Sequence, residues 1–320
     1  MRSAAKPVVC IITPGTKAAN NGNWRTAARW AQMLRDRCKV IVQTEWSGER
    51  ADAMIALHAR RSADSIKAYR TAHKGGLAVV LTGTDLYGDL PDSIEAADSL
   101  RIADRLVVLQ ESALDALSPR DRARAQVIFQ SAERSPARVK PRDRLDCVAV
   151  GHLRPVKDPR TLISAWRVLP DDAPIFLRHI GAPLDKDLAN LARDYARRDA
   201  RYRYAGALPH AATRLAIARA HLLVHPSVAE GGANVIVEAV TSGTAVLASR
   251  IPGNVGMLGE DYPGYFNPGD AKHLASRLLQ AQGDRSYLKL LQAACARRRL
   301  LFTPSREARA IGALVASLLA

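Results

Sequence analysis

The chain opens with Pro7-Val8-Val9-Cys10-Ile11-Ile12-Thr13-Pro14-Gly15, a short apolar run that ends at a Thr-Pro-Gly turn. Such a run is typical of a buried strand. A loop rich in Asn and Gly follows at residues 17–23, and residues 24–37 then space their apolar side chains for one buried helix face. A second apolar run follows at 39–43. Strand, glycine-containing loop, helix and strand in this order predict a βαβ unit.

The same alternation continues outward from this unit. Up to residue 129 we predict strands at 53–57, 77–82, 105–109 and 126–129, and helices at 62–73, 93–103 and 111–117. A polar stretch with two prolines, 131–146, is interpreted as an interdomain linker. After it we predict strands at 145–150, 174–180, 202–206, 222–225 and 245–249, helices at 161–168, 186–198, 211–220 and 232–242, and two helical stretches at 270–301 and 305–319.

This rhythm predicts an α/β protein with two Rossmann-like, doubly wound parallel domains that face a central cleft. In such sheets, ligands bind beyond the carboxyl ends of the strands. We therefore expect the functional residues directly after strands. The length of 320 residues also favours two domains.

Composition narrows the possible classes. The net charge is +16, from 37 Arg and 10 Lys against 31 acidic residues, so anionic ligands are favoured, although a solvated basic surface would look the same. Only 5% of residues are aromatic and no basic tract is interleaved with them, which argues against a stacking nucleic-acid module. No apolar run is long enough to span a bilayer. Four widely spaced cysteines predict neither a disulfide framework nor a zinc cluster, and favour the cytoplasm.

The strongest functional pattern is the stretch Pro226 to Glu238, in which a strand ends at a Pro-Ser turn and Glu230 precedes two glycines. Glycines at the start of a helix let backbone N–H groups approach an anion, and the helix dipole favours negative charge there. Glu230 can accept hydrogen bonds from neutral hydroxyls. Glu238, two turns into the helix, can reach a ribose. The alternative is a loop with a salt-bridged glutamate.

A second pattern follows the first strand of the second domain: Gly151-His152-Leu153-Arg154-Pro155-Val156-Lys157-Asp158. Arg154 and Lys157, three residues apart, can hold a diphosphate and neutralise it as it leaves. A basic loop is often only solvated. Its position before the glutamate pair, in the same domain, is what makes it informative.

Together these two patterns resemble the donor-site signature of GT-B glycosyltransferases of family 4. Arg105-Leu106-Val107-Val108-Leu109-Gln110-Glu111-Ser112, Val127-Ile128-Phe129-Gln130-Ser131 and Ala245-Val246-Leu247-Ala248 resemble further parts of that family, in the same order. The resemblance covers nearly the whole chain, and its second half is the specific part.

The resemblance implies residues 1–135 as an acceptor-binding domain, 145–300 as a nucleotide-sugar-binding domain, and 301–320 as a helix that packs back on the first. Arg154, Lys157 and Glu230 would be the catalytic residues, acting without a metal or other cofactor and with retention of anomeric configuration. The expected donor-binding residues are Gly15, Arg154, Lys157, Gly181, Leu208, Glu230, Gly231, Gly232, Ala233, Asn234, Val235 and Glu238. Within this set, Arg154 and Lys157 would bind the diphosphate, and Glu230 with the following backbone would bind the sugar. Glu238 would bind the ribose, and the base would lie near Gly181 and Leu208.

Two departures from the family pattern stand out. The family usually has Phe in the position of Gly232 and Gly in place of Asp158. The chain is also short for the family, mainly in its first half, so the loops of the first domain are expected to set the acceptor.

Three such loops follow predicted strands of the first domain. The first, 20–26, combines Asn20, Asn21, Asn23 and Arg25 at a helix start, which suits a small anion, unless Asn23 merely caps the helix. The second, 57–62, offers His58, Arg60 and Arg61, where His58 is an acceptor contact, a base or a structural residue. The third, 82–87, offers Thr84 and Asp85, and Asp85 either binds the acceptor or caps a turn.

These loops, read as 20–30, 57–62 and 82–87, resemble the selenosugar synthases of selenoneine biosynthesis, a branch of the same family. That resemblance implies transfer from UDP-N-acetylglucosamine or UDP-glucose to selenophosphate, with a carbon–selenium bond formed, and a cleft lined by Arg25, Arg60 and Arg61. One alternative is an ordinary family-4 enzyme that acts on a lipid or saccharide hydroxyl. Others are a non-catalytic nucleotide-sugar binder and a nucleic-acid binder, which the set Arg154, Lys157, Glu230 and Glu238 disfavours. The sequence fixes neither the preferred sugar nor the oligomeric state.

Overall fold

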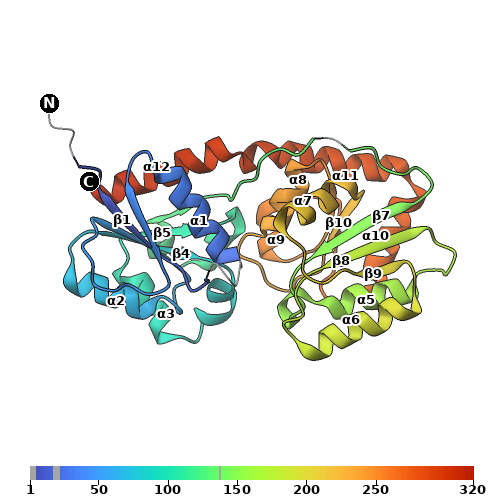
Figure 1. Cartoon of the computed structure of the whole chain (residues 1–320), viewed down its shortest axis with the longest axis horizontal. Helices are drawn as coiled ribbons and strands as arrows, with labels where there is room; N and C mark the ends of the chain where they lie inside the picture. The colour runs from blue at the N-terminus through green and yellow to red at the C-terminus, as the bar shows by residue number, and fades with distance from the viewer. Residues whose placement is uncertain (1–4, 17–21, 137) are drawn as a thin grey trace. The chain divides into compact units, whose positions relative to one another are not determined.

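The chain divides into two compact units in the computed structural model, which describes residues 5–16, 22–136 and 138–320. Unit 1 comprises Met1–Gln130 and Thr303–Ala320, and unit 2 comprises Ser131–Phe302 (Figure 1). In the described part of each unit, six strands form one fully parallel sheet. The predicted class, two doubly wound Rossmann-like sheets, is therefore confirmed.

The sheet of unit 1 has the order β2-β1-β3-β4-β5-β6. Its strands are β1 (Val8–Ile12), β2 (Lys39–Gln43), β3 (Ala53–Leu57), β4 (Gly76–Leu81), β5 (Arg105–Val108) and β6 (Ala125–Val127). Its helices are α1 (Gly22–Leu34), α2 (Ala63–Ala72), α3 (Ile94–Ile102), α4 (Pro119–Arg122) and α12 (Pro304–Leu319), with a π-helical turn η1 (Asp85–Asp89) and a 3₁₀ segment η2 (Glu111–Ala116).

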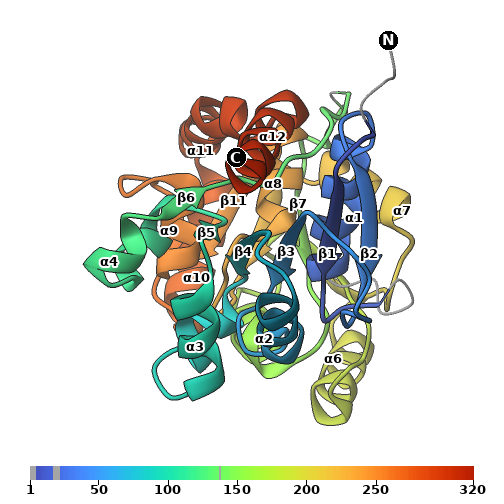
Figure 2. The same cartoon turned by 90° about the vertical axis from the view of Figure 1, so that its left-hand side faces the viewer.

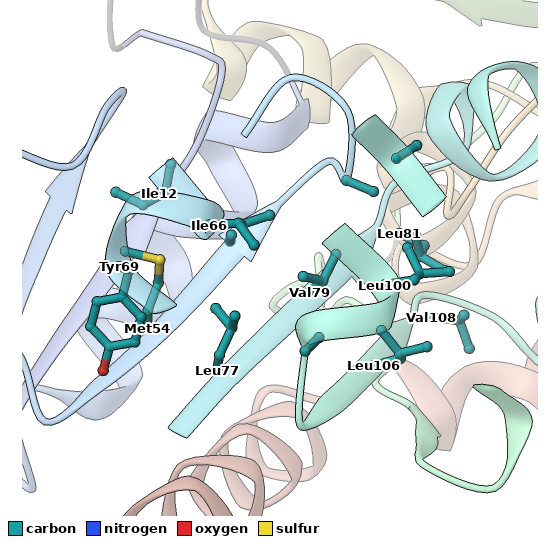
Figure 3. Packing of buried hydrophobic residues seen from close by; sticks show 14 of the residues in the cluster. Ile12, Met54, Ile66, Tyr69, Leu77, Val79, Leu81, Leu100, Leu106 and Val108 are labelled. Carbon is teal, nitrogen blue, oxygen red and sulfur yellow. The ribbon is translucent and has the colours of Figure 1, made fainter. Parts of the chain in front are cut away.

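Alternation along the strands divides the core of unit 1 between the two faces of its sheet. On one face, Cys10 and Ile12 pack with residues of α2 and α3, such as Ile66 and Leu100 (Figure 3). On the other face, Val9 and Ile11 pack with α1 and α12. Figure 2 shows how these helices flank the sheet. Because successive side chains of a strand point to opposite faces, a continuous apolar run such as β1 serves both layers.

The final helix, α12, belongs to unit 1 and lies beside α1 (Figure 1). Its Glu307 is buried, and the carboxylate accepts hydrogen bonds from Trp30 Nε1 at 2.7 Å and from Arg29 Nε at 2.8 Å. A buried charge needs such partners, because leaving it unpaired would cost several kcal/mol. The last 18 residues thus complete the helical layer of the first sheet.

The sheet of unit 2 has the order β12-β11-β10-β7-β8-β9. Its strands are β7 (Leu145–Val150), β8 (Ile175–Ile180), β9 (Tyr202–Tyr204), β10 (Leu222–His225), β11 (Ala245–Ser249) and β12 (Tyr265–Phe266). Its helices are α5 (Pro159–Val168), α6 (Lys186–Arg198), α7 (His210–Arg219), α8 (Asn234–Thr241), α9 (Pro252–Leu258), α10 (Ala271–Gly283) and α11 (Arg285–Arg298), with 3₁₀ turns η3 (Pro155–Lys157) and η4 (Arg299–Phe302).

The structure corrects several predicted boundaries. The helical stretch 270–301 is broken where Asp284 caps α11, accepting from Ser286 N at 2.8 Å and Tyr287 N at 3.2 Å. The donor-side helix begins at Asn234 rather than at Gly232, so both glycines belong to the loop. The sequence analysis missed α4, α9 and β12, which are too short to show a clear periodicity.

The stretch 131–146, predicted to be a linker, is counted with unit 2, and its last two residues belong to β7. Its contacts give the reason: Arg214 donates to Ser135 Oγ at 2.9 Å, and His221 Nε2 lies 2.9 Å from Pro141 O. The four cysteines are all buried and unbridged. Burial raises the pKa of Cys10 to about 12 and that of Cys295 to about 11.

Candidate functional site

The candidate donor site lies at the carboxyl edge of the unit 2 sheet, where β7 and β10 are neighbours. The loop after β7 carries Arg154 and Lys157, and the loop after β10 runs from Pro226 to Ala233. The two loops are joined by a backbone hydrogen bond from Val228 N to Val156 O, 3.0 Å long. Parallel pairing of adjacent strands therefore brings together residues that are more than 70 positions apart in the sequence.

Glu230 and Lys157 form an ion pair in this site, through Glu230 Oε1 and Lys157 Nζ. His225 Nε2 lies 3.2 Å from the same oxygen. Burial raises the pKa of Glu230, but Lys157 and His225 outweigh it and hold that pKa below the ordinary range of a glutamate. The side chain keeps 10% exposure, so a carboxylate that favours its ionised form reaches the surface of the site.

Arg154 is the contrasting cation. It is exposed and precedes η3, and none of the described residues pairs with its guanidinium. Lys157 carries its charge beside a carboxylate, whereas Arg154 carries a charge that no described carboxylate balances. An arginine of this kind can bind phosphate oxygens through two parallel N–H groups.

The start of α8 adds a second attraction for anions. Its N-cap is Ala233, which has no side-chain acceptor, and the first turn contains no acidic residue. The first N–H groups of a helix have no partner within the helix and carry the positive end of its dipole. Gly231, Gly232, Asn234 and Val235 lie around this start, and Gly232 and Asn234 are partly exposed. Such an arrangement attracts an anionic group.

Glu238 lies in the second turn of α8 and is 7% exposed. His210 Nε2, at the start of α7, lies 2.8 Å from Glu238 Oε1. The sequence analysis assigned Glu238 to a ribose and did not include His210. The structure gives this carboxylate a histidine neighbour on one oxygen, which fixes its direction.

Gly181 and Leu208 were expected near the base. A Cβ atom at Gly181 would lie 1.8 Å from Gly151 O, so the two loops after β7 and β8 approach too closely for any side chain there. This packing alone requires a glycine. Leu208 is half-buried just before α7.

The first candidate acceptor loop is described only in part. Asn20 and Asn21 lie outside the described residues. Asn23 and Arg25 are half-buried in the first turn of α1. Because α1 begins at Gly22, Asn23 is inside the helix, and the alternative that it is the N-cap is wrong. Gly15, expected to contact the donor, is buried in unit 1, three residues after the end of β1.

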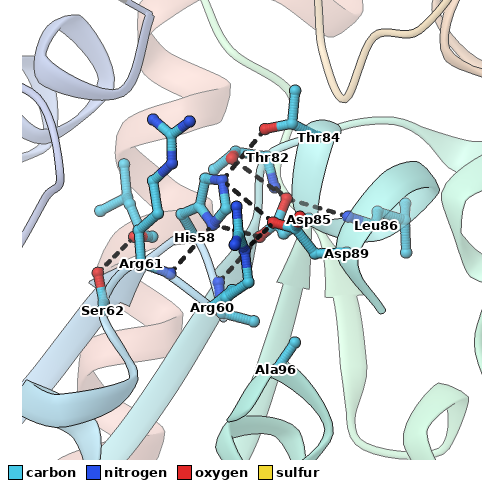
Figure 4. Close-up of polar contacts among 12 residues, drawn as sticks. His58, Arg60, Arg61, Ser62, Thr82, Thr84, Asp85, Leu86, Asp89 and Ala96 are labelled. Atoms are coloured by element: carbon cyan, nitrogen blue, oxygen red, sulfur yellow. Dashed lines mark hydrogen bonds and ion pairs between the residues drawn. The ribbon is translucent and has the colours of Figure 1, made fainter. Parts of the chain in front are cut away.

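The loops after β3 and β4 do meet, as Figure 4 shows. Asp85 is fully buried, and its carboxylate accepts hydrogen bonds from Thr82 N at 2.7 Å, Ala59 N at 2.9 Å and Leu86 N at 3.1 Å. These bonds make Asp85 the residue that ties one loop to the other. A carboxylate with three backbone donors has little capacity left for a ligand.

His58 lies at the centre of this cluster with a backbone φ of +74°, a conformation that is unfavourable for residues other than glycine. Its Nδ1 accepts from Arg61 N at 3.4 Å, and its Nε2 lies 3.1 Å from Thr84 Oγ1 (Figure 4). Burial lowers the pKa of His58, with Asp85 opposing the effect. The ring is therefore neutral, with the proton on Nε2 and directed at the Thr84 oxygen. This leaves the exposed Thr84 hydroxyl free to donate.

The two arginines beside His58 differ. Arg60 Nε lies 2.9 Å from Asp89 Oδ2, while Arg61 is exposed and no described residue pairs with its guanidinium (Figure 4). Asp89 was missed by the sequence analysis, as were His225 and His210. His225 ends β10, His210 begins α7 and Asp89 ends η1, the turn after β4, so their position near the carboxyl ends of strands is the signal that could have marked them.

Two classes of site find no support in the described residues. No group of three or more His, Cys, Asp or Glu side chains is placed to hold a metal ion in the part of the chain that the structure describes. Among the helices described, none combines the length and the apolar character needed to cross a membrane.

Two doubly wound parallel sheets with a final helix returning to the first unit form the architecture of the GT-B glycosyltransferase class. Residues 131–296 match the family model described as glycosyl transferases group 1, and this match covers more than half of the chain. The protein belongs to that family.

Solved structures agree in fold. HepE of Anabaena, in complex with UDP and glucose, is similar with a TM-score of 0.76 at 16% identity, over 98% of this chain and 100% of that one. Sucrose-phosphate synthase of Thermosynechococcus elongatus is similar with a TM-score of 0.79 at 16% identity, over 98% and 99%. A glycosyltransferase of Rickettsia africae gives a TM-score of 0.74 at 13% identity, over 98% and 99%. At these identities the likeness concerns the fold.

Proposed function

We propose that the protein transfers a sugar from a UDP-sugar, UDP-glucose or UDP-N-acetylglucosamine, to selenophosphate, without a metal or other cofactor, and so forms a selenosugar. The observation that carries the donor half is the edge of unit 2. Arg154, whose guanidinium pairs with no residue in the described part of the chain, lies there with an uncapped α8 start and an ionised Glu230 on neighbouring loops. Complexes of Anabaena HepE with UDP and with UDP-glucose support the choice of donor.

In this proposal Arg154, Lys157 and the N–H groups at the start of α8 bind the diphosphate. Glu230 accepts hydrogen bonds from the sugar hydroxyls, and Glu238 from the ribose. When the anomeric C–O bond breaks, its electron pair passes to the β-phosphate oxygen of UDP. Cations and helix N–H groups directed at that oxygen stabilise the charge that develops on it.

The acceptor half rests on unit 1. The loops 57–62 and 82–87 resemble those of selenosugar synthases. The first loop carries the Arg61 guanidinium and the second the Thr84 hydroxyl, and the two loops meet at His58 (Figure 4). A guanidinium and a hydroxyl donor suit a small phosphate-like anion. A neutral His58 whose Nε2 proton is directed at Thr84 is not placed as a general base. Selenophosphate needs none, because it is already an anionic nucleophile.

The chemistry balances with these two substrates. Selenium attacks the anomeric carbon, a C–Se bond forms, and UDP leaves with the electrons of the C–O bond. The first product is a sugar that carries a selenium-linked phosphate. Water then cleaves the P–Se bond and releases phosphate and the selenosugar.

The test is mass spectrometry of products after the protein is incubated with UDP-glucose or UDP-N-acetylglucosamine and selenophosphate. We expect UDP, phosphate and a selenosugar, with the ⁸⁰Se isotope pattern in the sugar product. Inorganic phosphate in place of selenophosphate is the matched control and should give no sugar product.

Two other results would decide against the proposal. UDP release without any selenium in the sugar product, together with transfer to a lipid or saccharide hydroxyl, would assign the protein to the ordinary branch of the family. Absence of UDP-sugar binding by calorimetry would remove the donor half as well.

A further inference from the structure

The carboxylate of Glu230 is contacted by two side chains of the protein, in addition to the sugar that it is proposed to bind. Lys157 Nζ and His225 Nε2 both contact Oε1, from the loop after β7 and from the last residue of β10. Neither contact involves Oε2. Lys157 donates to this oxygen and the His225 ring lies 3.2 Å from it, so both side chains restrict the rotation of the carboxylate and the direction in which Oε2 faces.

The backbone around Glu230 is fixed independently. A Cβ atom at Gly253, in the first turn of α9, would lie 2.0 Å from Glu230 O, so this loop packs directly against α9. Val228 N donates to Val156 O at 3.0 Å, and Ser249 Oγ donates to Ser227 O. The position of the loop therefore does not depend on the imidazole of His225.

His225 itself is 2% exposed, and its Nε2 makes no hydrogen bond to another described residue; the polar contact that it does have is Glu230 Oε1, 3.2 Å away. A ring nitrogen that faces a carboxylate oxygen at 3.2 Å must carry the proton, because two lone pairs would repel each other. The cavity beneath the site is lined by His225, Ser227 and Lys157 among others, so the ring borders the site without reaching its surface.

From this geometry we infer that His225 is a positioning residue: it donates to Oε1 of Glu230 and thereby aims Oε2 at a hydroxyl of the donor sugar. The inference rests on the proposed donor site. It predicts different effects on two measured affinities, which a general loss of structure would not produce. Affinity for UDP, which lacks the sugar, does not depend on His225, whereas affinity for UDP-glucose does.

The experiment is calorimetric titration of the full chain with UDP and with UDP-glucose. In His225→Leu we expect UDP-glucose to bind about tenfold more weakly, with UDP affinity within about twofold of the wild type. His225→Gln places an amide N–H where Nε2 lies and should restore UDP-glucose affinity. His225→Asn, whose amide reaches only the Nδ1 position, should behave like His225→Leu and serves in its place if that variant does not fold.

His221 is the matched control, because it is a buried histidine at the opposite end of the same strand and contacts Asp146 N and Pro141 O. His221→Leu should lower the melting temperature and leave the ratio of the two affinities unchanged. Equal loss of UDP and UDP-glucose affinity in His225→Leu, or no loss of either, would overturn the inference while leaving the donor site in place. If the wild-type protein bound neither UDP nor UDP-glucose, both the inference about His225 and the proposed donor site would be wrong.

Discussion

The carboxyl edges of the two sheets differ in which charged side chains are neutralised by neighbouring residues. In unit 2, Arg154 pairs with none of the residues that the structure describes and the start of α8 has no side-chain cap, which is the arrangement that would attract a large anion. In unit 1, Asp85 is consumed by backbone donors and Arg60 is paired with Asp89, so one guanidinium and one hydroxyl remain. Each edge thus keeps one guanidinium that no described carboxylate balances, and the uncapped start of α8 is what distinguishes the edge proposed for a diphosphate from the edge proposed for a small oxyanion.

The largest expected effect is at Arg154. Arg154→Ala should lower kcat/KM for the UDP-sugar by about 100- to 1000-fold, because it removes the unbalanced cation that stabilises the leaving diphosphate. Steady-state kinetics at saturating acceptor measure this. Arg160→Ala, an exposed arginine six residues further along on α5, is the control and should stay near wild type. Similar activity in both variants would break the comparison between the two edges.

The stability of unit 2 is expected to depend on pH through a histidine in its interior, away from the charged edge. Burial lowers the pKa of His179 to about 4, and its Nδ1 lies 2.6 Å from the Tyr202 hydroxyl. Below pH 6.5 the unfolded chain binds a proton that the folded chain refuses, so stability falls as the pH falls. Between pH 7 and pH 5 the loss from this group is about 2 kcal/mol.

Urea unfolding at the two pH values measures this loss. His179→Gln should show a change with pH that is smaller by about that amount. An unchanged pH dependence in the variant would mean that His179 titrates normally in the folded protein.

The acceptor edge predicts unequal arginines. Arg61→Ala should raise KM for selenophosphate about tenfold, because its guanidinium is unbalanced, whereas Arg60→Ala should change it only about twofold, because Asp89 already neutralises Arg60. The KM for the UDP-sugar should stay constant in both variants. The reverse order would show that Asp89 releases Arg60 when the acceptor binds, and would sharpen the view of unit 1.

The smallest effect concerns Asp158, where the family usually has glycine. Asp158 has a φ of +43°, in the left-handed region of backbone conformation. Its side chain also caps α5, because it accepts a hydrogen bond from Thr161 N at 3.1 Å. Asp158→Gly should therefore change the unfolding free energy by less than about 0.5 kcal/mol, while Asp158→Ala should cost about 2 kcal/mol, from backbone strain and the lost cap. Thermal unfolding of both variants checks this, and equal values would contradict it.

The sequence predicted the fold well because long apolar runs and helix periods repeat through both halves. The strands Leu222–His225 and Ala245–Ser249 and the helix Lys186–Arg198 have the predicted bounds. The family resemblance placed Lys157 and Glu230 in one site, and the structure brings these two together because they follow β7 and β10, which are neighbours; their roles stay predictions. The sequence could not predict that Lys157 and His225 share one oxygen of Glu230, or that Asp89 holds Arg60, since those contacts depend on side-chain directions that no spacing encodes.

The buried cysteines have a consequence for handling the protein. All four thiols lie inside the two sheets' packing layers, and burial raises the pKa of each one, so thiolate is scarce at neutral pH. Electrophiles and oxidised selenium species therefore find no ready sulfur nucleophile on the folded chain. We expect the native protein to resist alkylation by iodoacetamide and to stay free of intermolecular bridges when reductants are left out of an assay.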